Sequence, residues 1–122
     1  MHFSDLKVYC ISKELEQKVI PIINGISYSW NIPQVSQIRR SSSSVTANII
    51  EGCSHQKYPK NYIRFLTIAL GSCDETQHHL FILNQKKCIN DNVYEKLVKK
   101  YKNLAVRINN FITIIKNNHN LP

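Results

Sequence analysis

Residues that form tight turns are scarce in this sequence, whose 122 residues include only 3 glycines and 4 prolines. An all-β fold needs many tight turns, so this scarcity argues against one. Long apolar runs are also missing, because no stretch reaches the about 18 residues that suggest a membrane span. No charged start is followed by a hydrophobic run, so we predict no signal peptide. These absences predict a cytoplasmic protein without a membrane segment.

Patterns of catalytic and metal-binding residues are equally sparse. Glu75 and His78 have the E-x-x-H spacing of ferritin-like iron sites, but those sites need a second such motif and two further glutamates. His78 and His79 are therefore expected at the surface or at a subunit interface. Serines 41–44 lack a Gly-x-Ser-x-Gly elbow and a convincing histidine–acid pair. We predict no catalytic residue, no metal site and no cofactor.

The cysteines are spread singly along the chain, without the C-x-x-C spacing of a zinc site or a redox motif. We expect reduced thiols, as in a cytoplasmic protein. They are Cys10, Cys53, Cys73 and Cys88.

Apolar residues recur at i, i+3 and i+4 along most of the chain, which is the spacing of amphipathic helices. Proline, glycine and asparagine separate these segments, and we predict helices over about residues 5–24, 33–51, 59–87 and 91–117. Short connections make consecutive helices antiparallel. The sequence therefore predicts one all-α domain over 1–122, an antiparallel up-down-up-down four-helix bundle.

Several residues mark the expected ends of these helices. Pro21 removes a backbone donor, so the first helix is expected to end near Ile20 or to kink there. Trp30, in the linker that follows, is expected to pack against the bundle. The other predicted boundary residues are Ser4 or Asp5 as the first cap, Pro33 and Pro59 in the first turns of the second and third helices, Gly52 as a left-handed cap of the second, and Asn90 or Asp91 as the last cap.

The least ordinary stretch is 37–52, where four consecutive serines lie within helical spacing. Serine is a mediocre helix former because its hydroxyl competes for backbone hydrogen bonds. We therefore expect another helix to approach closely here. Gly71 in the third helix, which costs about 1 kcal/mol relative to alanine, is expected to serve the same purpose. The predicted apolar-to-small stripe is Ile38, Ser42, Val45 and Ile49.

A polar stripe lies beside the apolar one. Its members are expected to meet the third helix in a structural polar clamp, including a buried ion network, that fixes how the two helices are aligned. The predicted clamp is Arg40, Ser44, Asn48, Glu51 and Glu75.

Three stretches carry a resemblance to a known family. They are Phe3 to Tyr9, the QIRR and N-x-x-E-G motifs between 37 and 52, and the F-L-x-x-A-L-G-S motif at 65–72. On these motifs, over about residues 3–115, the sequence resembles the 23S ribosomal RNA intervening-sequence proteins. That family includes the accessory variability-determining proteins of diversity-generating retroelements. Tyr9 departs from the family pattern, which usually has tryptophan there.

The resemblance implies a four-helix bundle that assembles with itself into a barrel-like homopentamer. It implies no established enzyme activity. Members of the retroelement branch are basic and bind nucleic acid and a reverse transcriptase, so RNA or DNA and a reverse transcriptase or other protein are the partners that the resemblance suggests.

The formal charge is +8, with 16 Lys and Arg against 8 Asp and Glu. Such an excess is typical of proteins with an anionic partner, although a solvated lysine surface has the same composition. Tyr94 and Tyr101 are read either as stacking residues for unpaired bases or as core. The predicted nucleic-acid contacts are Arg39, Lys57, Lys60, Arg64, Lys86, Lys87, Lys96, Lys99, Lys100 and Arg107, of which Lys96, Lys99, Lys100 and Arg107 are expected on one side of the last helix.

Taken together, these features predict a non-enzymatic, homo-oligomeric four-helix bundle that binds RNA or DNA through lysine and arginine faces. One form of this hypothesis makes the protein an accessory to a nucleic-acid enzyme. The alternative is a structural or protein-interaction module with no nucleic-acid role.

Overall fold

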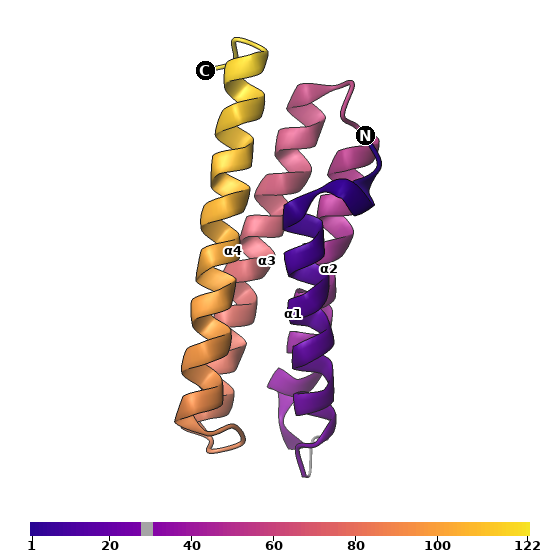
Figure 1. Ribbon diagram of the computed structural model, residues 1–122. Helices are drawn as coiled ribbons and strands as arrows, with labels where there is room; N and C mark the ends of the chain where they lie inside the picture. The colour runs from indigo at the N-terminus through magenta and orange to yellow at the C-terminus, as the bar shows by residue number, and fades with distance from the viewer. Residues whose placement is uncertain (28–30) are drawn as a thin grey trace.

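The computed structural model describes residues 1–27 and 31–122, and these form helices without any strand. A 3-10 turn, η1 (Phe3–Asp5), precedes α1 (Lys7–Asn24), α2 (Pro33–Ser54), α3 (Pro59–Gln85) and α4 (Asp91–Asn118). Consecutive helices run in opposite directions, and both termini lie at the same end (Figure 1). The predicted all-α, up-down-up-down bundle is confirmed. None of the helices in the described part combines the length and apolar character that a membrane span requires.

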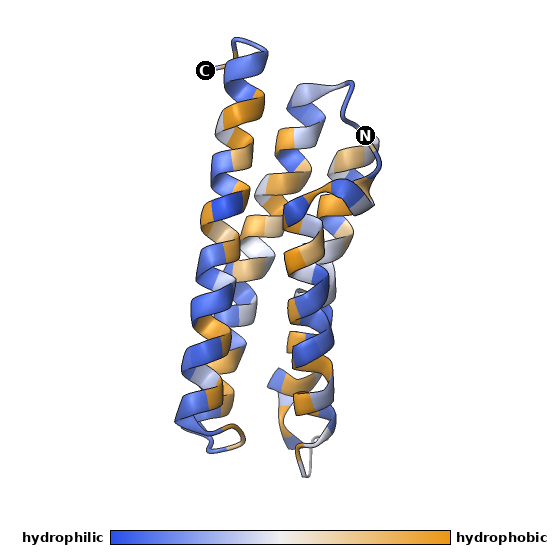
Figure 2. Ribbon diagram, in the orientation of Figure 1, coloured by the Kyte–Doolittle hydropathy of each residue, from blue (hydrophilic) through white to orange (hydrophobic). Residues whose placement is uncertain are grey.

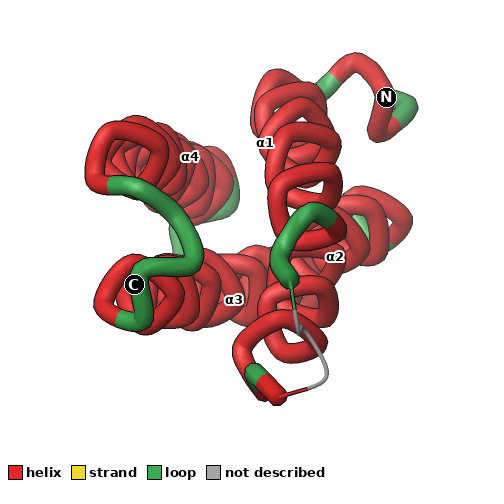
Figure 3. Tube along the Cα trace, turned by 90° about the horizontal axis from the view of Figure 1, so that it is seen from below, coloured by secondary structure: helices red, strands yellow, loops and turns green. Residues whose placement is uncertain are grey.

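The core runs the length of the bundle and takes side chains from every helix. Apolar residues face inward and polar ones outward, which appears as alternating orange and blue along each ribbon (Figure 2). Seen end-on, the helices occupy four corners around this core (Figure 3). Large side chains that are almost completely buried include Val19 and Ile23 of α1, Ile38 and Ile49 of α2, Leu66 and Leu80 of α3, and Tyr101, Leu104 and Ile108 of α4.

Local sequence determines most of the helix starts. Pro33 and Pro59 occupy the first turns of α2 and α3, as predicted. Asn90 caps α4, since its Oδ1 accepts a 2.8 Å hydrogen bond from the Val93 amide. The expected cap at Ser4 or Asp5 is wrong, because both residues belong to η1 and Leu6 precedes α1 without a side-chain hydrogen bond.

The expected end or kink near Ile20 is replaced by a helix that continues through Pro21 to Asn24. Proline removes only its own donor, and Pro21 lies on the exposed side of α1, where water can satisfy the carbonyl left without a partner. The Gly25 amide then closes the helix, 3.2 Å from the carbonyl oxygens of Pro21 and Ile22. Trp30 lies outside the described residues.

The two helical glycines have roles opposite to those expected. Gly52 does not end α2, which continues to Ser54, and its φ is not positive. A Cβ at Gly52 would lie 3.0 Å from Tyr62 Cδ1 and 3.3 Å from Phe65 Cβ, so this glycine is where α3 approaches α2 closely. Gly71 is exposed and a Cβ there would have nothing within 4 Å, so the close approach expected at Gly71 is wrong.

The last two helices also differ slightly from expectation at their ends. Helix α3 ends at Gln85, and Lys87 in the following turn has a left-handed φ of 61°. Helix α4 extends one residue further than predicted, to Asn118.

Candidate functional site

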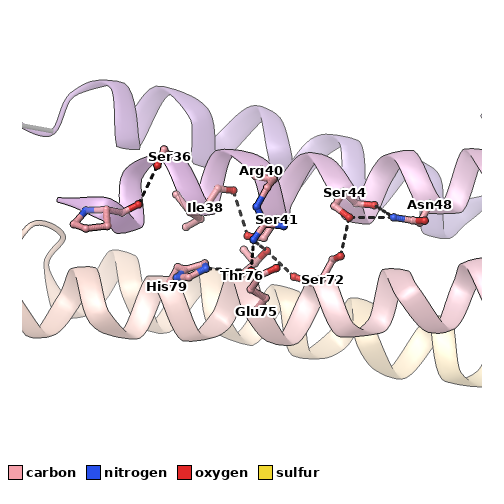
Figure 4. Close-up of polar contacts among 11 residues, drawn as sticks. Ser36, Ile38, Arg40, Ser41, Ser44, Asn48, Ser72, Glu75, Thr76 and His79 are labelled. Atoms are coloured by element: carbon pink, nitrogen blue, oxygen red, sulfur yellow. Dashed lines mark hydrogen bonds and ion pairs between the residues drawn. The ribbon is translucent and has the colours of Figure 1, made fainter. Parts of the chain in front are cut away.

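The α2–α3 interface is formed by small polar residues. Ser41 is fully buried, and its Oγ lies 2.8 Å from Oγ1 of Thr76, which is also 2.8 Å from the Ser72 carbonyl oxygen. Further along, the Oγ atoms of Ser44 and Ser72 lie 2.8 Å apart, and Asn48 donates to the Ser44 carbonyl at 2.8 Å (Figure 4). The hydroxyls of Ser41 and Ser44 are thus satisfied across the interface, whereas that of Ser42 donates to the Arg39 carbonyl oxygen of its own helix.

The ion pair expected in the clamp lies at the rim of this interface. Arg40 pairs with Glu75, and their side chains are 63% and 35% exposed, so the predicted burial of this pair is wrong. Glu51 does not reach α3. Its Oε1 lies 3.4 Å from Nε2 of His55, the residue that follows the end of α2. Arg40, Ser44, Asn48 and Glu75 lie along the α2–α3 interface, whereas Glu51 is outside it.

His79 is buried at the same interface, contrary to the expected surface position, whereas His78 is exposed. The side chain of His79 is 8% exposed, and neither ring nitrogen has a hydrogen-bond partner among residues 1–27 and 31–122, although Nε2 lies 3.6 Å from Glu75 Oε1. Burial lowers the pKa of His79 below its usual value, and the neighbouring Glu75 opposes this only in part. No three His, Cys, Asp or Glu side chains within 1–27 and 31–122 are grouped so that they could hold a metal ion.

The ten predicted nucleic-acid contacts are all exposed, but they do not form one patch. Lys60 and Arg64 lie in the first turns of α3, and Lys86 and Lys87 follow its last residue. A helix of 27 residues is about 40 Å long, so these two pairs lie at opposite ends of the bundle. Lys57 is in the turn just before α3, and Arg39 projects from α2.

A third set of basic residues lies along a groove between α1 and α4, called here the α1–α4 groove. It consists of two hollows that share Arg107 and Asn110. The larger, about 580 Å³, is lined by Ile11, Glu14, Leu15, Lys100, Asn103, Leu104, Val106, Arg107 and Asn110. The smaller, about 330 Å³, is lined by Met1, Asp5, Leu6, Lys7, Val8, Arg107, Asn110, Phe111 and Ile114.

Not all of the predicted α4 residues face this groove. Lys100 and Arg107 line it, but Lys99 lines a different hollow together with Glu95 and Lys102. The prediction that Lys99 shares a side with Lys100 and Arg107 is therefore wrong. Lys99 lies one residue, about 100° of helix rotation, away from Lys100.

Two lysines of α1 also belong to this basic set, and sequence reasoning missed them. Lys18 Nζ lies 3.0 Å from Glu14 Oε1, and its hydrogen bond and positive charge lower the pKa of Glu14. The pKa of Lys100 is lowered, mainly by the positive charge of the neighbouring Lys18 and to a smaller extent by burial and by Lys96. Lys7 lines the smaller hollow. Two helices distant in sequence therefore bring like charges together, and a carboxylate lines each hollow, Glu14 the larger and Asp5 the smaller.

The two tyrosines considered for base stacking are both at least partly buried against other side chains. Tyr101 is 1% exposed, and burial raises the pKa of its hydroxyl. Tyr94 is half-buried and its ring lies 6.4 Å from that of Phe81. Phe111 is the aromatic residue of the groove, where it lines the smaller hollow and packs edge-on against Tyr62 at 5.4 Å.

Comparison with known proteins gives a family and a fold. A family model described as 23S rRNA-intervening sequence protein matches residues 4–110. A crystal structure of a protein of unknown function from the S23 ribosomal protein family of Bacteroides thetaiotaomicron is similar, with a TM-score of 0.78 and 24% identity over 86% of this chain and 97% of that one. No curated protein matches the chain.

Proposed function

The chain belongs to the 23S rRNA-intervening sequence protein family, and from that premise we propose that it is a non-enzymatic, homo-oligomeric protein that binds RNA or DNA. The observation that carries the proposal is that Lys100 and Arg107 line the α1–α4 groove, with Lys18 beside it through its 3.0 Å ion pair with the groove residue Glu14. Lysine and arginine side chains that line one surface bind phosphates without reading base sequence.

The charges of the groove favour an anion as its ligand. Glu14 is paired with Lys18 at 3.0 Å, and neither Lys96 nor Lys100 forms an ion pair within the described residues. Repulsion between the amines of Lys18 and Lys100 is relieved when an anion lies between them. The net charge of +8 acts in the same direction, since it attracts a polyanion over the whole surface.

Self-association would strengthen such binding. Ile68 and Phe81 of α3 are large apolar side chains that are exposed, 45% and 42%, and are suited to contacts between copies. A homopentamer, which the resemblance implies, would present five grooves, and simultaneous contacts would raise the overall affinity. In the accessory role, the same oligomer would deliver a nucleic acid to a reverse transcriptase or another protein.

The test is binding of a structured RNA and of a DNA duplex, measured by fluorescence anisotropy at several salt concentrations. We expect affinity to fall linearly on a log–log plot against salt, because each neutralised phosphate releases counterions. The variant Lys100→Glu/Arg107→Glu should bind at least about tenfold more weakly and with a shallower slope.

The matched control is Lys60→Glu/Arg64→Glu, which replaces the same two residue types on the outer side of α3 and should retain most of the affinity. Equal losses in both variants would mean that net charge alone causes binding. No binding of either nucleic acid at low salt would contradict the proposal and favour a structural or protein-interaction module.

A further inference from the structure

We propose that the α1–α4 groove is a site for single-stranded nucleic acid, with phosphates beside Lys18, Lys100 and Arg107 and an unpaired base in the smaller hollow. This inference rests on the proposed function, and it adds the strandedness of the ligand and the place where a base would be held. It follows from how the two hollows differ along the groove.

The larger hollow has the features of a phosphate subsite. Lys100 and Arg107 line it seven residues apart, on the same side of α4 and about 10 Å from one another along the helix axis. Lys18 of α1 lies beside this hollow, where its amine is 3.0 Å from Oε1 of the lining residue Glu14. Amines from two sides of a groove can follow a flexible backbone that lies between them.

The smaller hollow is mainly apolar and has a different chemistry. Leu6 and Val8 from the start of the chain face Phe111 and Ile114 of α4 across it. Ile114 is 54% exposed, which is unusual for an isoleucine and leaves an uncovered apolar surface beside a basic one. The volume of the smaller hollow, about 330 Å³, falls within the range of about 300–1,000 Å³ typical of small-ligand pockets.

Arg107 and Asn110 join the two hollows, because both residues line both. The Asn110 amide carries donors and an acceptor that can bond to a base edge, and the Arg107 guanidinium can hold the phosphate beside it. Lys100 and Ile114 lie about 21 Å apart along α4, which is enough length for several nucleotides.

A base within a duplex cannot enter this hollow, since its faces are stacked and its hydrogen-bonding edge is paired. A rigid duplex would contact only the basic rims of the groove. An unpaired strand can place its backbone on the lysines and turn a base onto the apolar surface. The combination of charge, amide and apolar surface therefore fits a single strand better than a duplex.

The test compares a labelled single strand of about ten nucleotides with a duplex of the same length, each as RNA and as DNA, for binding to the full-length protein. We expect the single strand to bind at least about tenfold more tightly than the duplex. The variants Ile114→Ala and Asn110→Ala should each weaken single-strand binding by about fivefold and leave duplex binding unchanged, in line with the loss of one apolar contact or one hydrogen bond.

The matched control is Asn109→Ala, which truncates an exposed asparagine of α4 that lines neither hollow, and circular dichroism checks that every variant is folded. A 4-thiouridine placed in the RNA strand should photo-crosslink to peptides containing residues 107–114. Equal affinity for single strand and duplex, with no effect of Ile114→Ala or Asn110→Ala, would overturn this inference and leave the proposed function standing. Absence of binding to any of the four oligonucleotides would overturn both.

Discussion

The α2–α3 interface and the α1–α4 groove differ in how closely their helices approach. At the first, Gly52 and buried Ser41 and Ser72 let α2 and α3 pack directly against each other. At the second, long side chains such as Lys100 and Arg107 line the space between α1 and α4, and hollows remain. One bundle therefore contains a closely packed pair of helices and a pair with an open groove between them.

This difference suggests that the two helix pairs have different roles, one in stability and the other in ligand binding. Small residues allow close packing and hydrogen bonds between helices, so the α2–α3 interface contributes stability and fixes the alignment of the helices. Lysine, arginine and asparagine keep their polar ends in water, so α1 and α4 cannot close on each other along the groove. The groove contributes less to stability and remains available for a ligand.

The largest effect on stability is expected from the glycines of α2 and α3. Gly52→Val should lower the free energy of unfolding by about 1–3 kcal/mol, because the added methyl groups meet the rings of Tyr62 and Phe65. Gly71→Ala is the matched variant and should raise it by about 1 kcal/mol, since nothing lies near its Cβ and alanine favours the helix. Urea denaturation measures both. Changes of the same sign in the free energy of unfolding of the two variants would contradict the different roles of Gly52 and Gly71.

A smaller effect is expected from the hydrogen bond between Thr76 and Ser41. Thr76→Val should cost about 1 kcal/mol, because the fully buried Ser41 Oγ loses the 2.8 Å hydrogen bond from Thr76 and keeps only its longer one, 3.4 Å, to the Ile38 carbonyl oxygen. The double variant Ser41→Ala/Thr76→Val should recover part of that loss, since neither partner is then left unsatisfied. A double-mutant cycle measures this coupling. Additive losses would show that the two hydroxyls do not act as a pair.

The smallest effect is expected from pH. The pKa of His79 is lowered by burial, so the unfolded chain, with a pKa of about 6.5, takes up a proton more readily than the folded protein. The contribution of His79 to the free energy of unfolding should be fully present above a pH of about 6.5 and should decrease as the pH falls toward the lower pKa of the folded state. Glu75, Arg40 and His78 are the charged or titratable groups that act on this ring.

Thermal denaturation across this pH range checks the prediction. His79→Leu should reduce the loss of stability on acidification, whereas His78→Gln, at an exposed position, should not. An unchanged pH dependence in His79→Leu would mean that other groups cause it.

Much of the fold could be predicted from sequence, because helix formation and burial depend on local spacing. Ile38, Ser42, Val45 and Ile49 are all buried, as their stripe predicts. The roles of Gly52 and Gly71 could not be assigned, since periodicity does not show which side of a helix meets a neighbour closely. Both glycines satisfy the same local pattern, and only the arrangement of α2 against α3 distinguishes them.

The candidate site was only partly predictable for the same reason. Lys100 and Arg107 are recognisable as basic residues on one helix, but Lys18 is 82 residues from Lys100 in sequence and becomes its neighbour only when α1 and α4 lie side by side. The Glu14–Lys18 pair at i, i+4 is a local signal that could have drawn attention to this part of α1.

We infer that nucleic acid binds along α1 and α4, whereas α2 and α3 hold the fold together. Hydrogen exchange with and without a single-stranded RNA of about ten nucleotides tests it most directly. We predict added protection in residues 7–18 and 96–114 and slow, unchanged exchange in 38–49 and 66–80. Added protection centred on 57–64, or faster exchange in the free protein within α2 and α3 than within α1 and α4, would contradict it.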